Sequence, residues 1–392
     1  MKKIISMFLL VLFLIPGIVR ASDTVKVDQK IELAGNAKSA ILIEATTGKI
    51  IYEKNSHEKL APASMTKIMS MLLIMENIDK GNIKWNDKVT ASENASGMGG
   101  SQILLETGEQ MTVKDLFKGI AVASGNDAVV ALAEYIAGSV DEFVKMMNDK
   151  VKELGLHDTV FKNPHGLDTA NHYSSAYDMA IIAKELIKHE DVFKYTSIYE
   201  DFLWKGTDRE LWLVNTNKLV KFNPIVDGLK TGYTKEAGYC LTATAKKDGM
   251  RLISVVMGEP DTNTRSNETN ELLNYGLSKY KAETLMKKNK VIDKLNIEKA
   301  SKRSVNIVPI SDYSIVKEKT KKIGKISYDL DLNNIKLPFK KGKKIGKLKV
   351  FENNKLIKEL DVTINEDLKK ANIIVLYGRY LKGILNGNIN LK

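Results

Sequence analysis

The hydrophobic positions along the chain follow helical spacing over much of the first half and strand spacing over the second. Apolar residues at 39–44 and 49–53 flank a turn that contains Gly48, and this pattern predicts a β-hairpin. A continuous apolar run from Ile68 to Met75, without Gly or Pro, predicts a buried helix. Further helices are predicted at 113–123, 128–136, 141–154 and 175–188.

Short apolar runs separated by glycine-containing turns replace the helical pattern from Leu211 onward. Strands are predicted at 224–232, 239–246 and 251–258, and a closing helix at 268–282. We therefore predict an α/β (α+β) domain. In it, the early hairpin and the late strands form one antiparallel sheet with helices packed on it.

Two different patterns follow this first domain. Residues 287–365 form short alternating runs rich in Lys, Ile, Val and Asn, which predict a small all-β sandwich. Residues 372–385 place most of their apolar side chains on one side of a helix. Gly378 and Gly383 interrupt this stretch, which is also too short to span a bilayer. We expect an amphipathic helix in the membrane interface, with docking on its own domain as the alternative.

The N-terminus has the features of an export signal. Lys2 and Lys3 precede an apolar stretch at 4–15, and Ala21 offers a small residue for cleavage before Ser22. An uncleaved anchor is the alternative, and in both cases the rest of the chain is exported. The predicted segments are a signal peptide at 1–21, a first domain at 22–282, a β-rich domain at 283–365 and an amphipathic tail at 366–392.

Charge is unevenly distributed along the chain, which carries a formal net charge of +12. Residues 283–392 hold 26 Lys and Arg against 12 Asp and Glu, whereas residues 22–282 hold 31 against 36. For an exported protein, the basic part suits an anionic envelope surface or lipid headgroups better than nucleic acid. Cys240 is the only cysteine in the sequence and lies in an apolar run, so we expect a buried thiol and no intrachain disulfide.

A hydroxyl and an amine lie three residues apart at Ser64 and Lys67, directly after Pro62 and before the apolar run. On a helix such residues share one face, so the two side chains are expected to reach each other. Burial or a neighbouring cation lowers the pKa of a lysine, and the neutral amine can then act as the base for a serine nucleophile. This pair alone is also common in the polar first turn of a core helix.

Two further motifs follow in order, and together the three are Ser64-Met65-Thr66-Lys67, Ser124-Gly125-Asn126 and Lys230-Thr231-Gly232. This ordered set is that of penicillin-binding proteins and serine β-lactamases. Beyond it, the chain resembles the low-molecular-mass penicillin-binding proteins that are D-alanyl-D-alanine carboxypeptidases. The resemblance includes residues 163–168, 175–180 and 227–232 and extends over nearly the whole chain.

The resemblance implies an activity. Ser64 would attack the penultimate D-alanine of a peptidoglycan pentapeptide and form an acyl-enzyme, which β-lactam antibiotics such as penicillin would block. No metal or other cofactor is expected. The protein would take part in cell-wall synthesis and cell shape, held peripherally at the outer face of the cytoplasmic membrane by its C-terminal helix.

The resemblance also implies a role for each site residue. Lys67 would be the general base, Ser124 would relay a proton, and Asn126 would bind the substrate amide and hold Lys67. Lys230 would supply a second cation. The expected substrate-binding residues are Thr231, Gly232, Tyr233 and Arg265, with the oxyanion hole at the backbone N–H groups of Ser64 and Tyr233 and the substrate carboxylate on Arg265. Many relatives have His where this chain has Tyr233.

Several alternatives remain open at this point. A β-lactamase would need a Glu-activated water, and no Glu-x-x-Leu-Asn element lies between Asn126 and Lys230. A DD-transpeptidase or endopeptidase shares the same motifs, and a non-catalytic cell-wall-binding scaffold would share the fold. His165 is a structural residue rather than the base, because Lys67 fills that role, and Arg265 could instead form a surface salt bridge.

Overall fold

The computed structural model describes residues 32–333 and 336–386. The predicted signal peptide at 1–21 lies outside the described residues. One unit extends from Leu33 to the end of the chain.

The first domain is built on a five-stranded antiparallel sheet, in the order β2-β1-β9-β8-β7. Its strands are β1 (Ser39–Glu44), β2 (Ile50–Lys54), β7 (Val226–Thr234), β8 (Gly238–Lys247) and β9 (Met250–Glu259). The first strand pairs with the last, for example Leu42 with Ser254, so the two ends of the domain meet in one sheet as predicted. The strand β7 is left at an edge.

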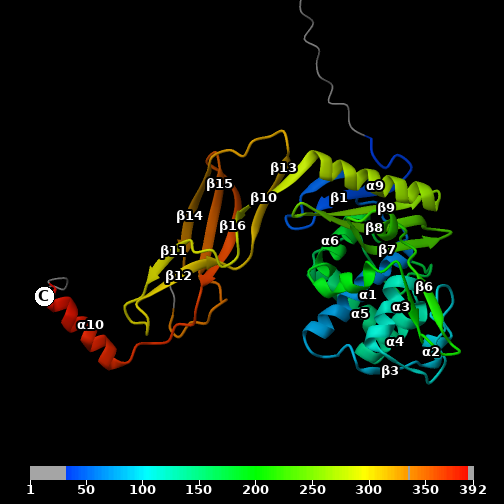
Figure 1. The fold of residues 1–392 in the computed structure, drawn as a ribbon, viewed down its shortest axis with the longest axis horizontal. Helices are drawn as coiled ribbons and strands as arrows, with labels where there is room; N and C mark the ends of the chain where they lie inside the picture. Colours follow the sequence, from blue (N-terminus) through cyan, green and yellow to red (C-terminus); the bar gives the residue numbers. More distant parts are fainter. Residues whose placement is uncertain (1–31, 334–335, 387–392) are drawn as a thin grey trace, which may run out of the picture. The chain divides into compact units, whose positions relative to one another are not determined.

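Alternate side chains of the sheet face two separate cores. Ile41 and Ile43 pack into the larger core with α1 (Lys67–Asp79), whereas Ala40 and Leu42 pack into a smaller core with α9 (Thr262–Lys279). Figure 1 shows α9 on one side of the sheet and α1 on the opposite side. The remaining elements of this domain are η1 (Ala63–Thr66), α2 (Glu93–Ser96), α3 (Val113–Ala123), α4 (Asn126–Ala137), α5 (Val140–Glu153), α6 (Ala176–Leu186), η2 (Glu190–Val192), α7 (Phe193–Thr196), α8 (Leu219–Phe222), β3 (Lys88–Thr90), β4 (Gln110–Thr112), β5 (Glu200–Leu203) and β6 (Leu211–Val214).

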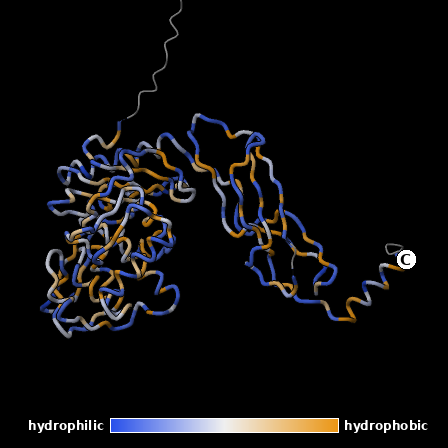
Figure 2. The backbone as a smooth tube through the Cα atoms, turned by 180° about the vertical axis from the view of Figure 1, so that it is seen from behind, coloured by the Kyte–Doolittle hydropathy of each residue, from blue (hydrophilic) through white to orange (hydrophobic). Residues whose placement is uncertain are grey.

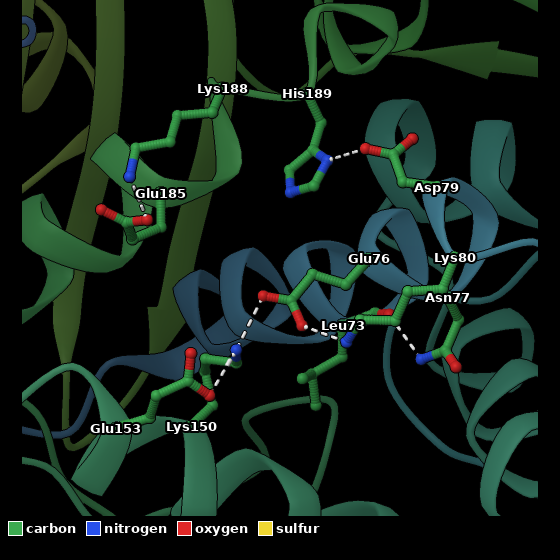
Figure 3. A network of polar contacts seen from close by, with 10 residues as sticks. All are labelled: Leu73, Glu76, Asn77, Asp79, Lys80, Lys150, Glu153, Glu185, Lys188 and His189. Carbon is green, nitrogen blue, oxygen red and sulfur yellow. Dashed lines mark hydrogen bonds and ion pairs between the residues drawn. The ribbon is translucent and has the colours of Figure 1, made fainter. Parts of the chain in front are cut away.

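Helix α1 is the central helix of the larger core and is buried from Lys67 to Met75. A helix that is apolar on all sides has to be covered on all sides. Its C-terminal end is joined to its neighbours by polar contacts, which Figure 3 shows. Lys150 of α5 lies 2.8 Å from Glu76 and 2.7 Å from Glu153, and His189 Nδ1 lies 2.6 Å from Asp79.

The closing helix differs from its prediction at both ends. It begins at Thr262 rather than 268, because the Asp261 side chain accepts hydrogen bonds from the N–H groups of Asn263 (2.7 Å) and Thr264 (2.9 Å). It ends at Lys279, and the next residues already belong to β10 (Tyr280–Met286). Arg265 therefore lies within the first turns of α9.

The second domain is all-β, as predicted, with two sheets that share one core. The larger sheet has the order β11-β12-β16-β15-β14, and the smaller one pairs β10 with β13. Met286 and Tyr313 of the smaller sheet pack with Val350 and Val362 of the larger one. The strands after β10 are β11 (Asp293–Asn296), β12 (Ser304–Pro309), β13 (Tyr313–Glu318), β14 (Ile326–Leu332), β15 (Gly346–Glu352) and β16 (Lys355–Ile364).

The tail contains α10 (Ile373–Leu385), which Asn372 caps by accepting the Val375 N–H at 2.8 Å. Arg379 joins this helix to the β-rich domain by donating to the carbonyl oxygens of Glu298 (2.8 Å), Ala300 (2.7 Å) and Ser301 (3.0 Å). Figure 2 shows hydrophobic and hydrophilic positions mixed along α10. Among residues 32–333 and 336–386, no helix is both long and apolar enough to cross a bilayer.

Candidate active site

Ser64 and Lys67 lie on two consecutive helical elements rather than on one α-helix, which differs from the prediction. Ser64 is in the 3₁₀ helix η1 and Lys67 is the first residue of α1. Side chains at i and i+3 of a 3₁₀ turn lie one above the other. The two groups therefore meet, and the Lys67 Nζ lies 3.0 Å from the Ser64 Oγ.

The Lys67 amine is fully buried and surrounded by oxygen atoms. Besides Ser64, its partners are the Asn126 Oδ1 at 2.6 Å and the His165 backbone oxygen at 2.7 Å. Burial lowers the pKa of Lys67 well below its usual value. The positive charge of Lys230 lowers this pKa further, and the carboxylate of Asp127 opposes the change. The environment thus favours a neutral amine beside the serine hydroxyl.

The second motif lies between two helices. Ser124 ends α3 in a left-handed conformation with φ 64°, and Asn126 begins α4. Asn126 uses both ends of its amide, because its Nδ2 donates to the Gly99 oxygen at 2.6 Å while its Oδ1 accepts from Lys67. The Ser124 Oγ is buried and has no hydrogen-bond partner within the described part of the chain. Such an unpaired group is available to a substrate.

The third motif runs along the edge strand β7. Lys230 is 1 % exposed, and burial followed by the charge of Arg265 lowers its pKa to about 7. The hydroxyl of Thr231 contacts that of Thr216. A Cβ added to Gly232 would lie 2.7 Å from the Pro62 oxygen, so a glycine is needed where β7 passes the segment before Ser64.

Two further predicted residues border this strand. The ring of Tyr233 is 54 % exposed and stacks on Tyr239, with ring centroids 4.3 Å apart. Arg265 is 5 % exposed, so its side chain is not on the surface as the ion-pair alternative required. Its Nε is buried without a hydrogen-bond partner among the described residues. Burial lowers the pKa of its guanidinium.

Residues 162–172 contribute to the site in a way that the three sequence motifs do not indicate. The His165 ring is not placed as a base, because its Nδ1 accepts the Leu167 N–H at 3.1 Å and it is the backbone oxygen that contacts Lys67. Burial, followed by the charge of Lys67, lowers the pKa of His165 to about 4. The sequence signal was the Asn-Pro-His-Gly stretch that begins at Asn163, whose composition is typical of a turn. Such a composition does not specify which group the backbone of the turn will contact.

Comparison with known proteins gives consistent matches over both domains. The D-alanyl-D-alanine carboxypeptidase family (Peptidase_S11) matches residues 24–261, and the penicillin-binding protein 5 C-terminal domain matches residues 280–370. The D-alanyl-D-alanine carboxypeptidase DacF of Bacillus subtilis (strain 168) is 49% identical over 380 residues, which cover 97% of this chain and 98% of DacF.

Solved structures resemble the chain as well. Penicillin-binding protein 5 from Haemophilus influenzae has a TM-score of 0.70 at 34% identity, covering 86% of this chain and 98% of that protein. Penicillin-binding protein D2 from Listeria monocytogenes, solved in its cefotaxime-bound form, has a TM-score of 0.57 at 30% identity. The match covers 63% of this chain and 98% of that protein.

Proposed function

Because the chain belongs to the D-alanyl-D-alanine carboxypeptidase family, we propose that Ser64 and Lys67 carry out the family's reaction as nucleophile and base. The protein is a serine-type D-Ala-D-Ala carboxypeptidase of the penicillin-binding protein family. It acts outside the cytoplasm on the pentapeptide stems of peptidoglycan, and β-lactams are its inhibitors. The observation that carries the assignment of residues is the 3.0 Å contact between the Ser64 hydroxyl and the buried Lys67 amine.

Acylation begins when the Lys67 lone pair takes the proton of the Ser64 hydroxyl. The Ser64 Oγ attacks the carbonyl carbon of the penultimate D-alanine, and a tetrahedral intermediate forms. We place its oxyanion at the backbone N–H groups of Ser64 and Tyr233. The close passage of Gly232 beside the Pro62 oxygen supports this, because it brings the start of η1 and the end of β7 together.

Collapse of the intermediate breaks the C–N bond to the terminal D-alanine. The leaving nitrogen needs a proton, which we assign to Lys67 acting through the Ser124 hydroxyl. The Ser124 Oγ is buried and has no hydrogen-bond partner among the described residues, so its hydroxyl is free to bond the leaving nitrogen. The Asn126 Nδ2 has one N–H on Gly99 and a second that can bind the substrate amide. Water then hydrolyses the ester and releases Ser64.

The free carboxylate of the substrate fits the cations at the edge of β7. The Nε of the Arg265 guanidinium has no hydrogen-bond partner among the described residues, and Arg265 lies close enough to Lys230 for its charge to lower the Lys230 pKa. Thr231, the next residue of β7 after Lys230, adds a hydroxyl to this edge strand. Arginine suits a carboxylate because its planar fork donates two parallel hydrogen bonds.

Release of D-alanine from a pentapeptide tests the assignment, with labelled penicillin as a second readout. The wild-type protein is expected to release D-alanine and to hold a slowly clearing label, whereas Ser64→Ala loses both by at least about 10³-fold. Ser278→Ala, an exposed serine near the end of α9, is a control that keeps the nucleophile and its surroundings. A fast-clearing label would instead indicate a β-lactamase, and no label would indicate a scaffold. An added acceptor amine that gains the acyl group would indicate a transpeptidase, and release from cross-linked dimers an endopeptidase.

We also propose that α10 holds the protein on the membrane surface. Ile373, Ile374, Tyr377 and Leu385 are 81, 77, 66 and 83% exposed. With 3.6 residues per turn, they lie on the side of α10 away from Arg379, which contacts the β-rich domain. An exposed apolar face on a helix next to a basic domain is typical of interfacial binding to anionic lipid.

A further inference from the structure

The three oxygen atoms around the Lys67 amine are not equivalent. The Asn126 Oδ1 at 2.6 Å and the His165 backbone oxygen at 2.7 Å only accept hydrogen bonds, whereas the Ser64 hydroxyl at 3.0 Å accepts and donates. A neutral amine has two N–H groups and one lone pair. When the two carbonyl oxygens take both N–H groups, the lone pair is left facing the Ser64 hydroxyl. The direction in which the Lys67 lone pair points thus depends on two carbonyl groups.

The Asn126 carbonyl comes from a motif residue, but the His165 carbonyl is held by a turn built on Asn163. The Asn163 side chain is buried, and its Oδ1 accepts the N–H groups of His165 (3.2 Å) and Gly166 (2.6 Å). Its Nδ2 donates to the Leu167 oxygen (3.0 Å) and the Thr169 Oγ1 (3.1 Å). All four hydrogen bonds stay within residues 163–169, so this one side chain closes the turn.

The turn is fixed on the nucleophile segment from two sides. The Ser70 hydroxyl of α1 donates to the Pro164 oxygen at 2.6 Å, one helical turn beyond Lys67. Gly166 has φ +90°, and a Cβ there would lie 1.8 Å from the Ala63 oxygen, so the turn is in direct contact with the residue before Ser64. A small displacement of this turn would therefore move the His165 oxygen relative to the amine.

His172 adds a third attachment between this segment and η1. Its Nδ1 accepts the Lys162 N–H at 2.9 Å, which leaves the proton on Nε2, and Nε2 contacts the Thr66 Oγ1 at 2.8 Å. Burial is the largest cause that lowers the pKa of His172 to about 4, so this tautomer persists at neutral pH. The segment thus contacts Thr66, Lys67 and Ser70.

We propose that Asn163 is a positioning residue for the general base. It holds the His165 carbonyl where this group takes one N–H of neutral Lys67, and so directs the lone pair at the Ser64 proton. After the proton has moved to the amine, the ammonium donates to the same two carbonyl oxygens and to the Ser64 oxygen. This inference rests on the proposed roles of Ser64 and Lys67 and gives Asn163 no contact with the substrate.

Acylation kinetics of the full-length protein with labelled penicillin test this role, because they separate the acylation rate constant from the affinity of the first complex. Asn163→Ala is expected to lower the rate constant about 10²-fold, as a displacement of about 1 Å does in other sites, with the affinity nearly unchanged. Asn148→Ala is the matched control. Its side chain also holds nearby backbone groups, those of Val144 and Phe161, and neither residue contacts the Lys67 amine. This control is expected to lower the melting temperature while the rate constant of the folded protein stays the same.

Asn163→Asp distinguishes positioning from support of the fold. The carboxylate keeps an acceptor for the His165 and Gly166 N–H groups, and its negative charge raises the pKa of Lys67. Its acylation is therefore expected to recover at alkaline pH, with the acidic limb of the rate profile moved to higher pH, whereas Asn163→Ala does not recover.

The proposal would be overturned if the acylation rate constants of Asn163→Ala and Asn163→Asp fell equally at every pH and in proportion to the loss of stability. A wild-type rate constant in Asn163→Ala would also overturn it. If Asn163→Ala does not fold, the acylation-rate profile of Asn163→Asp tests the proposal. An acidic limb moved to higher pH supports it, and a limb that does not move in this direction contradicts it. A wild-type protein that takes no label would instead contradict the assignment of Ser64 and Lys67 itself.

Discussion

At the residue scale, the reactivity of Ser64 depends on which of two buried amines is charged. Both Lys67 and Lys230 are removed from water, and the charge of Lys230 disfavours protonation of Lys67. Burial is the largest cause of the low pKa of Lys67 and the charge of Lys230 is the next. The second cation thus has an electrostatic effect on the base in addition to any contact with the substrate.

Replacing Lys230 should therefore move the pH dependence of acylation. The reactive form of Lys67 is neutral, so the rate constant rises with pH through the Lys67 pKa. In Lys230→Met the lost charge raises that pKa, and the acidic limb should move to higher pH. Lys230→Arg keeps the charge, so the acidic limb of its rate profile should stay at the wild-type pH even if the rate constant falls. The measurement is the rate of labelling by penicillin between pH 5 and 10. If the acidic limb does not move in Lys230→Met, burial alone lowers the pKa of Lys67.

The carboxylate role of Arg265 has its own test. Arg265→Gln should raise KM for a pentapeptide with a free C-terminal carboxylate by about 10- to 100-fold, since a hydrogen bond to a charged group contributes about 1.5–3 kcal/mol. The same peptide with a C-terminal amide lacks the anion, and its KM should change little. Arg209→Gln, an exposed arginine paired with Glu109, serves as control. Equal changes for both peptides would contradict a carboxylate contact.

At the element scale, α10 has two different sides. Arg379 attaches one side to backbone oxygens of the β-rich domain, and the apolar side chains project from the other. The preceding residues belong to the β-rich domain rather than to the tail, because Leu368 is buried in its core and forms a bridge with Phe339. A truncation that tests the helix should therefore end at Ala371, later than the predicted boundary at 365.

Charges on the apolar side of α10 should release the protein from membranes. We expect the double variant Ile374→Glu and Leu381→Glu, and the chain ending at Ala371, to lose binding to vesicles of anionic lipid by tenfold or more, because each buried CH₂ contributes about 0.8 kcal/mol. Penicillin labelling should be unchanged. The control is Val291→Glu with Leu356→Glu, two exposed apolar residues outside the helix. Cosedimentation with vesicles measures this, and undiminished binding of the truncated chain would contradict the anchor.

At the scale of the whole molecule, Glu268 links the two ends of the first domain and lies close to a second carboxyl group, that of Glu259. Glu259 ends β9 with its side chain 1% exposed, beside Glu268 of α9. Glu268 accepts hydrogen bonds from the Asn36 N–H at 3.0 Å and its Nδ2 at 2.6 Å, so it fixes the chain before β1. Burial, followed by the hydrogen bond and the charge of Glu268, raises the pKa of Glu259 to about 8.

This pair predicts a loss of stability toward alkaline pH. Glu259 holds its proton in the folded state up to about pH 8 and loses it near pH 4.5 when unfolded. The free energy of unfolding should thus fall as pH rises between these values. Glu259→Gln removes this loss, so its melting temperature relative to wild type should increase from pH 5 to pH 9. Glu236→Gln, an exposed glutamate, is the control. A difference that stays constant with pH would contradict a shared proton.

The sequence by itself determined the hairpin, the helices that follow it, the late strands and the all-β second domain, because these depend on local spacing of apolar residues. It also determined which residue types the site contains, since the spacing of Ser64 and Lys67 needs only one helical turn. It did not determine that Ser64 lies in a 3₁₀ turn, or that Arg265 lies inside α9 without an ion-pair partner among the described residues.

Only the tertiary structure decided the surroundings of the base. The His165 carbonyl reaches Lys67 across 98 residues of chain, and Glu268 of α9 holds the Asn36 N–H across 232 residues. Such contacts join segments that are distant along the chain and often use backbone atoms, whose position no side-chain pattern records. Burial then sets the pKa values of Lys67 and Lys230, and burial depends on how the whole domain packs.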